Sequence, residues 1–249
     1  MFDFEVLLSW NGLFFLMILS VLEIVLGIDN ILFISIVTDD LPENKKNKIR
    51  SLGLSIALLL RLALLSVVSW VIGLTEPLFT VFSKSFSAQS LVLFLGGIFL
   101  IYKSVQELHK SVSFPNKKNK SKLSSVFWII LQIVLIDLVF SFDSIISAIG
   151  MTNGMEDELN GNPIVIIYLA IIISMVIMLL FANRIGQFIK NYPTFKLIAL
   201  GFLLTIGVLL VADAFGHHIP KGYLYFALVF SFLIELFNNR IRNIKKTEI

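Results

Sequence analysis

Long apolar runs constrain this sequence more than any other feature. Seven of them, the last one short, lie at about 10–37, 51–74, 89–109, 126–150, 163–187, 195–213 and 222–237. About twenty apolar residues in a helix cross roughly 30 Å of hydrocarbon. Hydrophobic residues make up 57% of the chain, above the roughly 45–50% that is typical of soluble domains. The sequence therefore predicts an all-α polytopic membrane protein with about seven transmembrane helices.

Basic residues gather in alternate loops. They follow the first, third, fifth and seventh runs, at residues 45–50, 110–122, 184–196 and 240–246. The loops on the other side hold only Lys84 and Lys221. Since cytoplasmic loops carry the excess of Lys and Arg, we expect the N-terminus outside and the C-terminus in the cytoplasm. The N-terminus has no basic segment typical of a cleaved signal peptide, so we expect the first helix to stay.

Composition excludes several classes of function. The net charge is only +3 and the chain has no cysteine, so disulfides and thiolate metal sites are excluded. Basic residues interleaved with stacking aromatics do not occur outside the runs, which argues against nucleic-acid binding. The expected partner is the lipid bilayer, and the oligomeric state is left open.

Two of the runs carry the same acidic pattern. The segment "VLEIVLGIDNILFI" aligns without a gap with "LIDLVFSFDSIISA". The alignment pairs Glu23 with Asp137, Asp29 with Asp143 and Asn30 with Ser144, always 114 residues apart. Three runs fill each half, so the second copy enters the membrane in the opposite sense. We therefore expect one domain built on a three-plus-three inverted repeat, at about 10–109 and 126–213, with an extra helix at about 222–237.

The four acids lie well inside their runs. A charged side chain at a helix centre costs about 2.5–3.5 kcal/mol, and such residues usually mark functional sites. Glu23 and Asn30 are seven residues apart and share a helix face. A single cavity gathers all six polar residues if the helices unwind near Gly27 and near Ser141. The alternative is that these polar groups only join helices.

Carboxylate, amide and hydroxyl oxygens suit Mg²⁺, Ca²⁺ or Mn²⁺. We therefore predict Glu23, Asp29, Asn30, Asp137, Asp143 and Ser144 as ligands of a transported cation, with no prosthetic group. Four carboxylates overcompensate one dication, so one or two of them carry a proton, which offers a route to proton exchange. The chain's three histidines lie at run ends or in a loop.

Three further charged residues belong to this hypothesis. Arg61 lies near the centre of the second run, where a guanidinium needs a carboxylate. We expect it to neutralise the empty acid cluster and to yield when metal arrives, or else to form a fixed salt bridge. Glu107 and Asp213 lie near the ends of the third and sixth runs. We expect them either to bind the cation as it enters and leaves the membrane or to extend their side chains to the aqueous interface.

Four segments resemble the signature segments of the TerC family of bacterial integral membrane proteins. They are "EIVLGIDN", "DLVFSFDS", "FLIYKSVQELH" and "FGHHIPKGYLYFALVFSFLIELFN", and the resemblance covers about residues 10–242. It implies Mn²⁺ efflux across the bacterial cytoplasmic membrane and the three-helix inverted repeats of lysine-exporter-type transporters. The six predicted ligands, Arg61 and Glu107 match the family pattern. Asp213 departs from it, because a glutamate is expected nearby.

The leading prediction is a non-enzymatic exporter of a divalent cation, with Mn²⁺ favoured by the resemblance. A Ca²⁺/H⁺ antiporter fits the ligand chemistry equally well. An intramembrane aspartyl protease is a third reading, although the chain has "GID" at 27–29 and lacks the motif of such proteases. The fourth is an assembly or metalation factor without transport activity.

Overall fold

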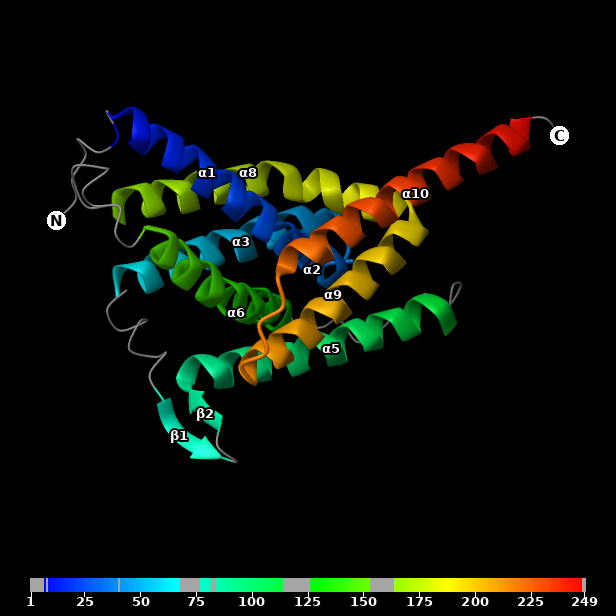
Figure 1. The fold of residues 1–249 in the computed structure, drawn as a ribbon. Helices are drawn as coiled ribbons and strands as arrows, with labels where there is room; N and C mark the ends of the chain where they lie inside the picture. The colour runs from blue at the N-terminus through cyan, green and yellow to red at the C-terminus, as the bar shows by residue number, and fades with distance from the viewer. Residues whose placement is uncertain are drawn as a thin grey trace. The chain divides into compact units, whose positions relative to one another are not determined.

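The computed structural model describes residues 7, 9–39, 41–67, 77–81, 84–113, 126–152 and 164–247. The chain divides into two compact units, residues 1–89 with 120–186 and residues 90–119 with 187–249. Figure 1 gives the order of the helices and strands. Each unit is described by itself below.

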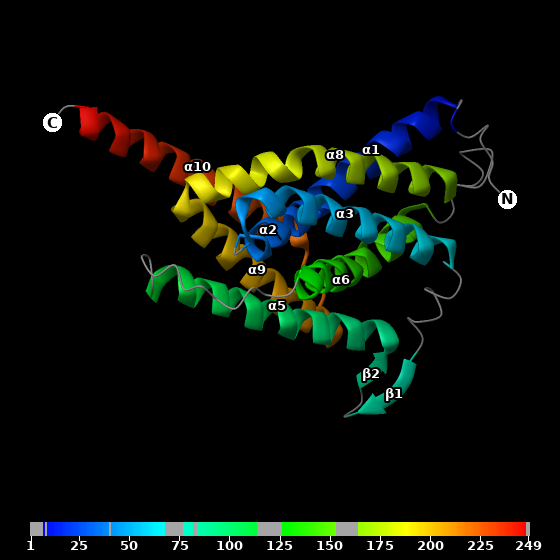
Figure 2. The ribbon, with the colours of Figure 1, turned by 180° about the vertical axis from the view of Figure 1, so that it is seen from behind.

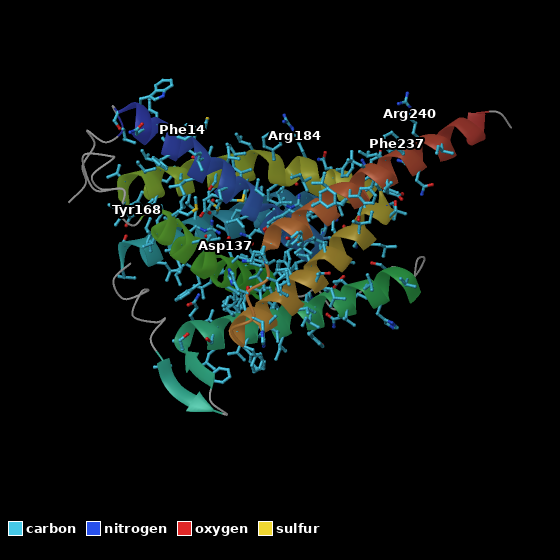
Figure 3. The ribbon with its side chains drawn as sticks, in the orientation of Figure 1. Phe14, Asp137, Tyr168, Arg184, Phe237 and Arg240 are labelled. Atoms are coloured by element: carbon cyan, nitrogen blue, oxygen red, sulfur yellow. The ribbon has the colours of Figure 1, made fainter. Side chains whose placement is uncertain are left out.

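The first unit contains the two halves of the first membrane span and three long helices. Its elements are α1 (Trp10–Leu26), α2 (Ile28–Val37), α3 (Glu43–Ser66), β1 (Pro77–Val81), β2 (Lys84–Ser87), α6 (Val126–Thr152) and α8 (Ile164–Asn191) up to Gly186. The helix α1 begins after Ser9, whose hydroxyl accepts a hydrogen bond from the Gly12 amide at 2.9 Å, the usual arrangement at a helix start. Apolar side chains on its outer face, such as Phe14, are exposed and suited to lipid (Figure 3).

The helix α3 lies between α6 and α8 in this unit (Figure 2). On the α6 side a Cβ atom at Gly53 would lie only 2.9 Å from Ile133 Cδ1, so the small residue permits a close approach. On the α8 side hydrogen bonds join both ends of the contact. Arg50 Nη1 donates to Asn183 Oδ1 at 3.3 Å, and Ser66 Oγ lies 2.7 Å from Tyr168 Oη. The position of α3 is thus fixed at both of its ends.

The second unit contains α5 (Ala88–Ser113) from Ser90 onward, the last residues of α8, α9 (Pro193–Ala214) and α10 (Lys221–Thr247). Gly207 lets α9 approach α5 closely, since a Cβ atom there would lie 3.0 Å from the Gly97 carbonyl oxygen. Aromatic ring pairs join α9 to α10, with ring centroids 5.2 Å apart for Phe195 and Phe232. Gly216, with φ of +77°, provides the left-handed turn after α9.

The prediction of seven membrane spans is confirmed. Among the described residues, seven helical stretches are long and apolar enough to cross a bilayer, with α1 and α2 together forming the first. The last helix continues through its polar tail to Thr247. The relation of the two halves by inverted symmetry is not tested and stays a prediction.

Several boundaries differ from the sequence prediction. The second span was expected at 51–74, but α3 runs from Glu43 to Ser66, because Pro42 can start a helix whose polar first turns precede the apolar run. Residues 68–74 lie outside the described part of the chain. The predicted all-α fold class is confirmed, and a short antiparallel hairpin, with Val81 opposite Lys84, lies between α3 and α5 in the chain.

Unwinding near Gly27 and near Ser141 was the condition for a single cavity to gather all six polar residues, and only Gly27 interrupts a helix. The first span ends as α1 at Leu26 and resumes as α2 at Ile28, with Gly27 between the two helices. By contrast, α6 continues as a helix through Ser141. The Ser141 hydroxyl donates to the carbonyl oxygen of Asp137 in the preceding turn. Such a bond is compatible with an intact helix, so a polar residue at this position does not require a break.

Candidate functional site

The centre of the candidate site is Arg61, which α3 places among α1 and α6. Its Nη1 donates to Glu23 Oε2 at 2.9 Å, and its Nη2 donates to Asp137 Oδ1 at 3.1 Å. Its Nε donates to Ser141 Oγ at 2.8 Å. All four side chains are buried, and Arg61 is only 2% exposed. The guanidinium therefore bridges two carboxylates from the two acidic motifs.

Asp137, labelled on α6 in Figure 3, has more hydrogen bonds than Glu23. Its Oδ1 also accepts from Asn30 Nδ2 at 3.0 Å, and its Oδ2 lies 3.1 Å from Ser141 Oγ. Ser141 lies four residues beyond Asp137 on the same face of α6. Buried charges are tolerated when they are paired and hydrogen-bonded, and Asp137 meets both conditions.

Two oxygen atoms of the same cluster are left open. Glu23 Oε1 and Asn30 Oδ1 are buried and have no hydrogen-bond partner within the described part of the chain. Each residue is only 2% exposed. A buried acceptor without a partner costs about 1–3 kcal/mol. Both atoms are hard oxygen donors, so water or a cation is the natural partner for them.

The remaining ligand candidates of the first unit lie near this cluster along the chain. Asp29 is buried in the first turn of α2, where the helix dipole favours a negative charge. The Ser144 hydroxyl donates to the Ser141 carbonyl oxygen at 3.3 Å. Asp143 belongs to α6, but its side chain lies outside the described structure.

The charges of the cluster do not balance. With both carboxylates ionised, Glu23 and Asp137 carry one negative charge more than Arg61 neutralises. An uncompensated charge in a buried, low-dielectric environment is costly. The cluster is therefore prepared to accept either a proton or a cation.

No metal centre is formed in this arrangement. Within the described residues, no three Asp, Glu or His side chains come together as a metal-binding group. Arg61 instead lies between the two acids that the sequence predicted as ligands. The ligand roles of the six predicted residues are untested and stay predictions.

The two outer candidates belong to the second unit. Glu107 is buried on α5, with its Oε1 2.7 Å from Lys110 Nζ and 3.7 Å from Lys103 Nζ. Asp213 lies near the end of α9, where its Oδ1 is 3.1 Å from Nδ1 of the exposed His218. These contacts give each acid a local partner. They leave open the predicted role in cation movement.

Sequence reasoning missed two polar residues of the first unit. Ser141 was noted only as a place for unwinding, although its four-residue spacing from Asp137 already put both on one face. Arg50 was counted only as a loop charge. It is 4% exposed and donates to Thr38 Oγ1 at 3.0 Å as well as to Asn183, so it ties α2, α3 and α8 together.

These features define a helical membrane protein whose spans enclose a partly neutralised cluster of acids. The chain belongs to the family described as "Integral membrane protein TerC family", which matches residues 8–248. The predicted resemblance to this family is thus confirmed. No solved structure shows a significant match to the chain.

Three bacterial relatives show how much of each protein is shared. The UPF0053 inner membrane protein YoaE of Escherichia coli (strain K12) is 46% identical over 94% of this chain and 43% of its own length. The UPF0053 inner membrane protein YgdQ of the same strain is 43% identical over 91% of this chain and 92% of its own length. A UPF0053 protein of Haemophilus influenzae is 42% identical over 93% and 94%. The chain therefore spans less than half of YoaE and nearly all of YgdQ.

Proposed function

We propose that this protein is a transporter that exports a hard divalent cation, with Mn²⁺ as its preferred substrate, and that it has no enzymatic activity. The observation that carries the proposal is the sharing of one buried guanidinium, Arg61, by two carboxyl groups, Glu23 and Asp137, together with the two open buried oxygens of the cluster. Intramembrane acids are costly and are typical of ion pathways. We place the protein in the bacterial cytoplasmic membrane, with its N-terminus outside.

Arg61 acts in this proposal as a resident cation that holds the empty site together. A dication that approaches Glu23 Oε1 and Asn30 Oδ1 repels the guanidinium, because like charges a few ångströms apart interact strongly in a low dielectric. Arg61 then withdraws, and the oxygens of Glu23 and Asp137 become available to the cation. The return of the Arg61 guanidinium to Glu23 and Asp137 then favours release of the cation. The same net charge is restored if protons enter as the cation leaves, which is the coupling route we propose.

The ligand chemistry indicates hard divalent cations as a class. The family resemblance then favours one cation within that class. Carboxylate, amide and hydroxyl oxygens suit Mn²⁺, Ca²⁺ and Mg²⁺ alike. The preference for Mn²⁺ rests on the resemblance to manganese-exporting members of the TerC family. A Ca²⁺/H⁺ antiporter remains the alternative within transport. The full ligand set that we propose also includes Asp29, Asp143 and Ser144.

Reconstituted vesicles test the proposal. The purified chain in liposomes should carry Mn²⁺ down an imposed gradient, and Ca²⁺ or Mg²⁺ should compete poorly. Protein-free liposomes provide the control. Absence of flux for every dication would contradict transport and support a non-transporting assembly or metalation factor. Flux of Ca²⁺ that exceeds flux of Mn²⁺ would support the antiporter.

A further inference from the structure

A buried methionine of α8 lies against the interruption of the first span. A Cβ atom added to Gly27 would overlap Met178 Sδ and would lie 3.0 Å from Met178 Cε. The Met178 side chain is fully buried at 0% exposure, and Gly27 is buried as well. The thioether thus occupies the space that the missing side chain of Gly27 leaves open.

The helix face that Met178 contacts is the face that carries the open oxygens. Glu23, Gly27 and Asn30 are spaced by four and three residues, and Gly27 keeps a nearly helical backbone with φ of −92° and ψ of −1°. Residues at this spacing lie above one another on one side of a helix. Glu23 and Asn30, which carry the open Oε1 and Oδ1 atoms, therefore lie on either side of Gly27, the residue that the Met178 sulfur contacts, on the same helix face.

We propose that Met178 determines substrate specificity, with its thioether as a soft donor beside the hard oxygens of Glu23 and Asn30. The inference rests on the proposed transport function. Thioether sulfur binds transition-metal cations and is a poor ligand for Ca²⁺ and Mg²⁺, which prefer oxygen. A site made of oxygens alone separates Mn²⁺ from Ca²⁺ and Mg²⁺ only through cavity size, ligand number and rigidity. One sulfur donor adds a distinction based on the softness of the cation.

Packing alone is the competing explanation, because methionine fills irregular gaps in buried regions. The two roles respond differently to an isosteric change. Met178→Leu keeps the volume and apolar character but removes the sulfur, and such swaps usually cost little stability. Met175→Leu is the matched control, since Met175 is equally buried on the same helix at 0% exposure.

The experiment measures Mn²⁺ flux in proteoliposomes with Cd²⁺ and Ca²⁺ as competitors. These two ions have similar radii and differ in softness, so their ratio of inhibition reports a sulfur donor. We expect wild type and Met175→Leu to be inhibited far more strongly by Cd²⁺ than by Ca²⁺. In Met178→Leu the ratio should fall by about tenfold, the size expected for loss of one metal-directed interaction. Met178→Ile, measured in parallel, supplies a second sulfur-free variant if the leucine variant does not fold.

The outcomes separate the two proposals. Wild-type vesicles that carry no dication would overturn the transport function and this inference together. Wild-type flux with an unchanged ratio of Cd²⁺ to Ca²⁺ inhibition in the folded Met178 variant would overturn the role of Met178 alone. A fall in the ratio that Met175→Leu reproduces would also overturn it, because both methionines would then act through packing.

Discussion

Asn30 Nδ2 donates a hydrogen bond to Asp137 Oδ1 across 3.0 Å, so the two acidic motifs meet in a buried contact. The residues are 107 positions apart in the chain. Arg61 contacts the same Asp137 oxygen, at 3.1 Å. The motifs that the sequence aligned are therefore parts of one network in the first unit.

Removal of Arg61 should destabilise the protein strongly. Arg61→Ala leaves Glu23 and Asp137 buried as unpaired acids, and breaking a buried ion pair from one side costs about 3–5 kcal/mol. Thermal unfolding in detergent measures the loss. The triple variant Arg61→Met, Glu23→Gln, Asp137→Asn should recover much of the stability without recovering transport. An Arg61→Ala protein with wild-type stability and full flux would exclude both a structural and a gating role.

Ser141 should matter more than an ordinary helix serine. Ser141→Ala removes the acceptor of Arg61 Nε, and hydrogen bonds to charged groups contribute about 1.5–3 kcal/mol. Ser231→Ala is the control, because the Ser231 hydroxyl donates to the Ala227 carbonyl oxygen of its own helix. We expect a clear drop in melting temperature for the first variant and little change for the second. Equal effects would mean that the contact with Arg61 contributes nothing.

Gly27 should tolerate no side chain. Gly27→Ala places a methyl group on Met178 Sδ, and overpacking of this kind costs about 1–3 kcal/mol. Gly201→Ala on α9 meets no atom within 4 Å and should be neutral or stabilising, because alanine favours a helix. Thermal unfolding compares the two variants. In a Met178→Ala background, Gly27→Ala should cost clearly less than it does in the wild type, and an equal cost in both backgrounds would place the strain elsewhere.

The orientation in the membrane can be tested directly because the chain has no cysteine. The residues Lys48 and His217 are exposed, and the charge pattern predicts them on the cytoplasmic and outer sides respectively. In intact cells, a membrane-impermeant maleimide should label His217→Cys and leave Lys48→Cys unlabelled until the membrane is opened. The reverse pattern would invert the topology.

The sequence was sufficient to predict the spans and every charged member of the network, but not Ser141 or the hydrogen bonds within the network. Apolar length fixed the seven helices, since hydrocarbon thickness leaves little choice. Arg61 was identified because it lies near the centre of an apolar run, where a guanidinium needs a carboxylate partner. Which carboxylate oxygens stay open depends on side-chain geometry, which spacing does not determine. The distinction between Glu23, with an open oxygen, and Asp137, with both oxygens in contact, therefore required the structure.

The two aligned motifs also show that equivalent positions in the sequence need not have the same backbone structure. Gly27 and Ser141 occupy equivalent positions, and an interruption at each was the condition for one cavity to hold all six polar residues. Glycine favours an interruption because it stabilises a helix poorly, whereas Ser141 satisfies its hydroxyl within α6 and with its neighbours. The hairpin of β1 and β2 lies between the predicted runs 51–74 and 89–109, in a segment for which no strand is predicted.

Mn²⁺ flux through isosteric acid variants tests the central claim most directly. In proteoliposomes, Glu23→Gln and Asp137→Asn should each reduce Mn²⁺ flux at least about tenfold, as expected when a residue of the metal pathway is lost, while Glu235→Gln on α10 keeps wild-type flux. Monodisperse, folded protein is confirmed for each variant before reconstitution. Wild-type flux in both cluster variants would contradict the claim that these buried acids carry the cation.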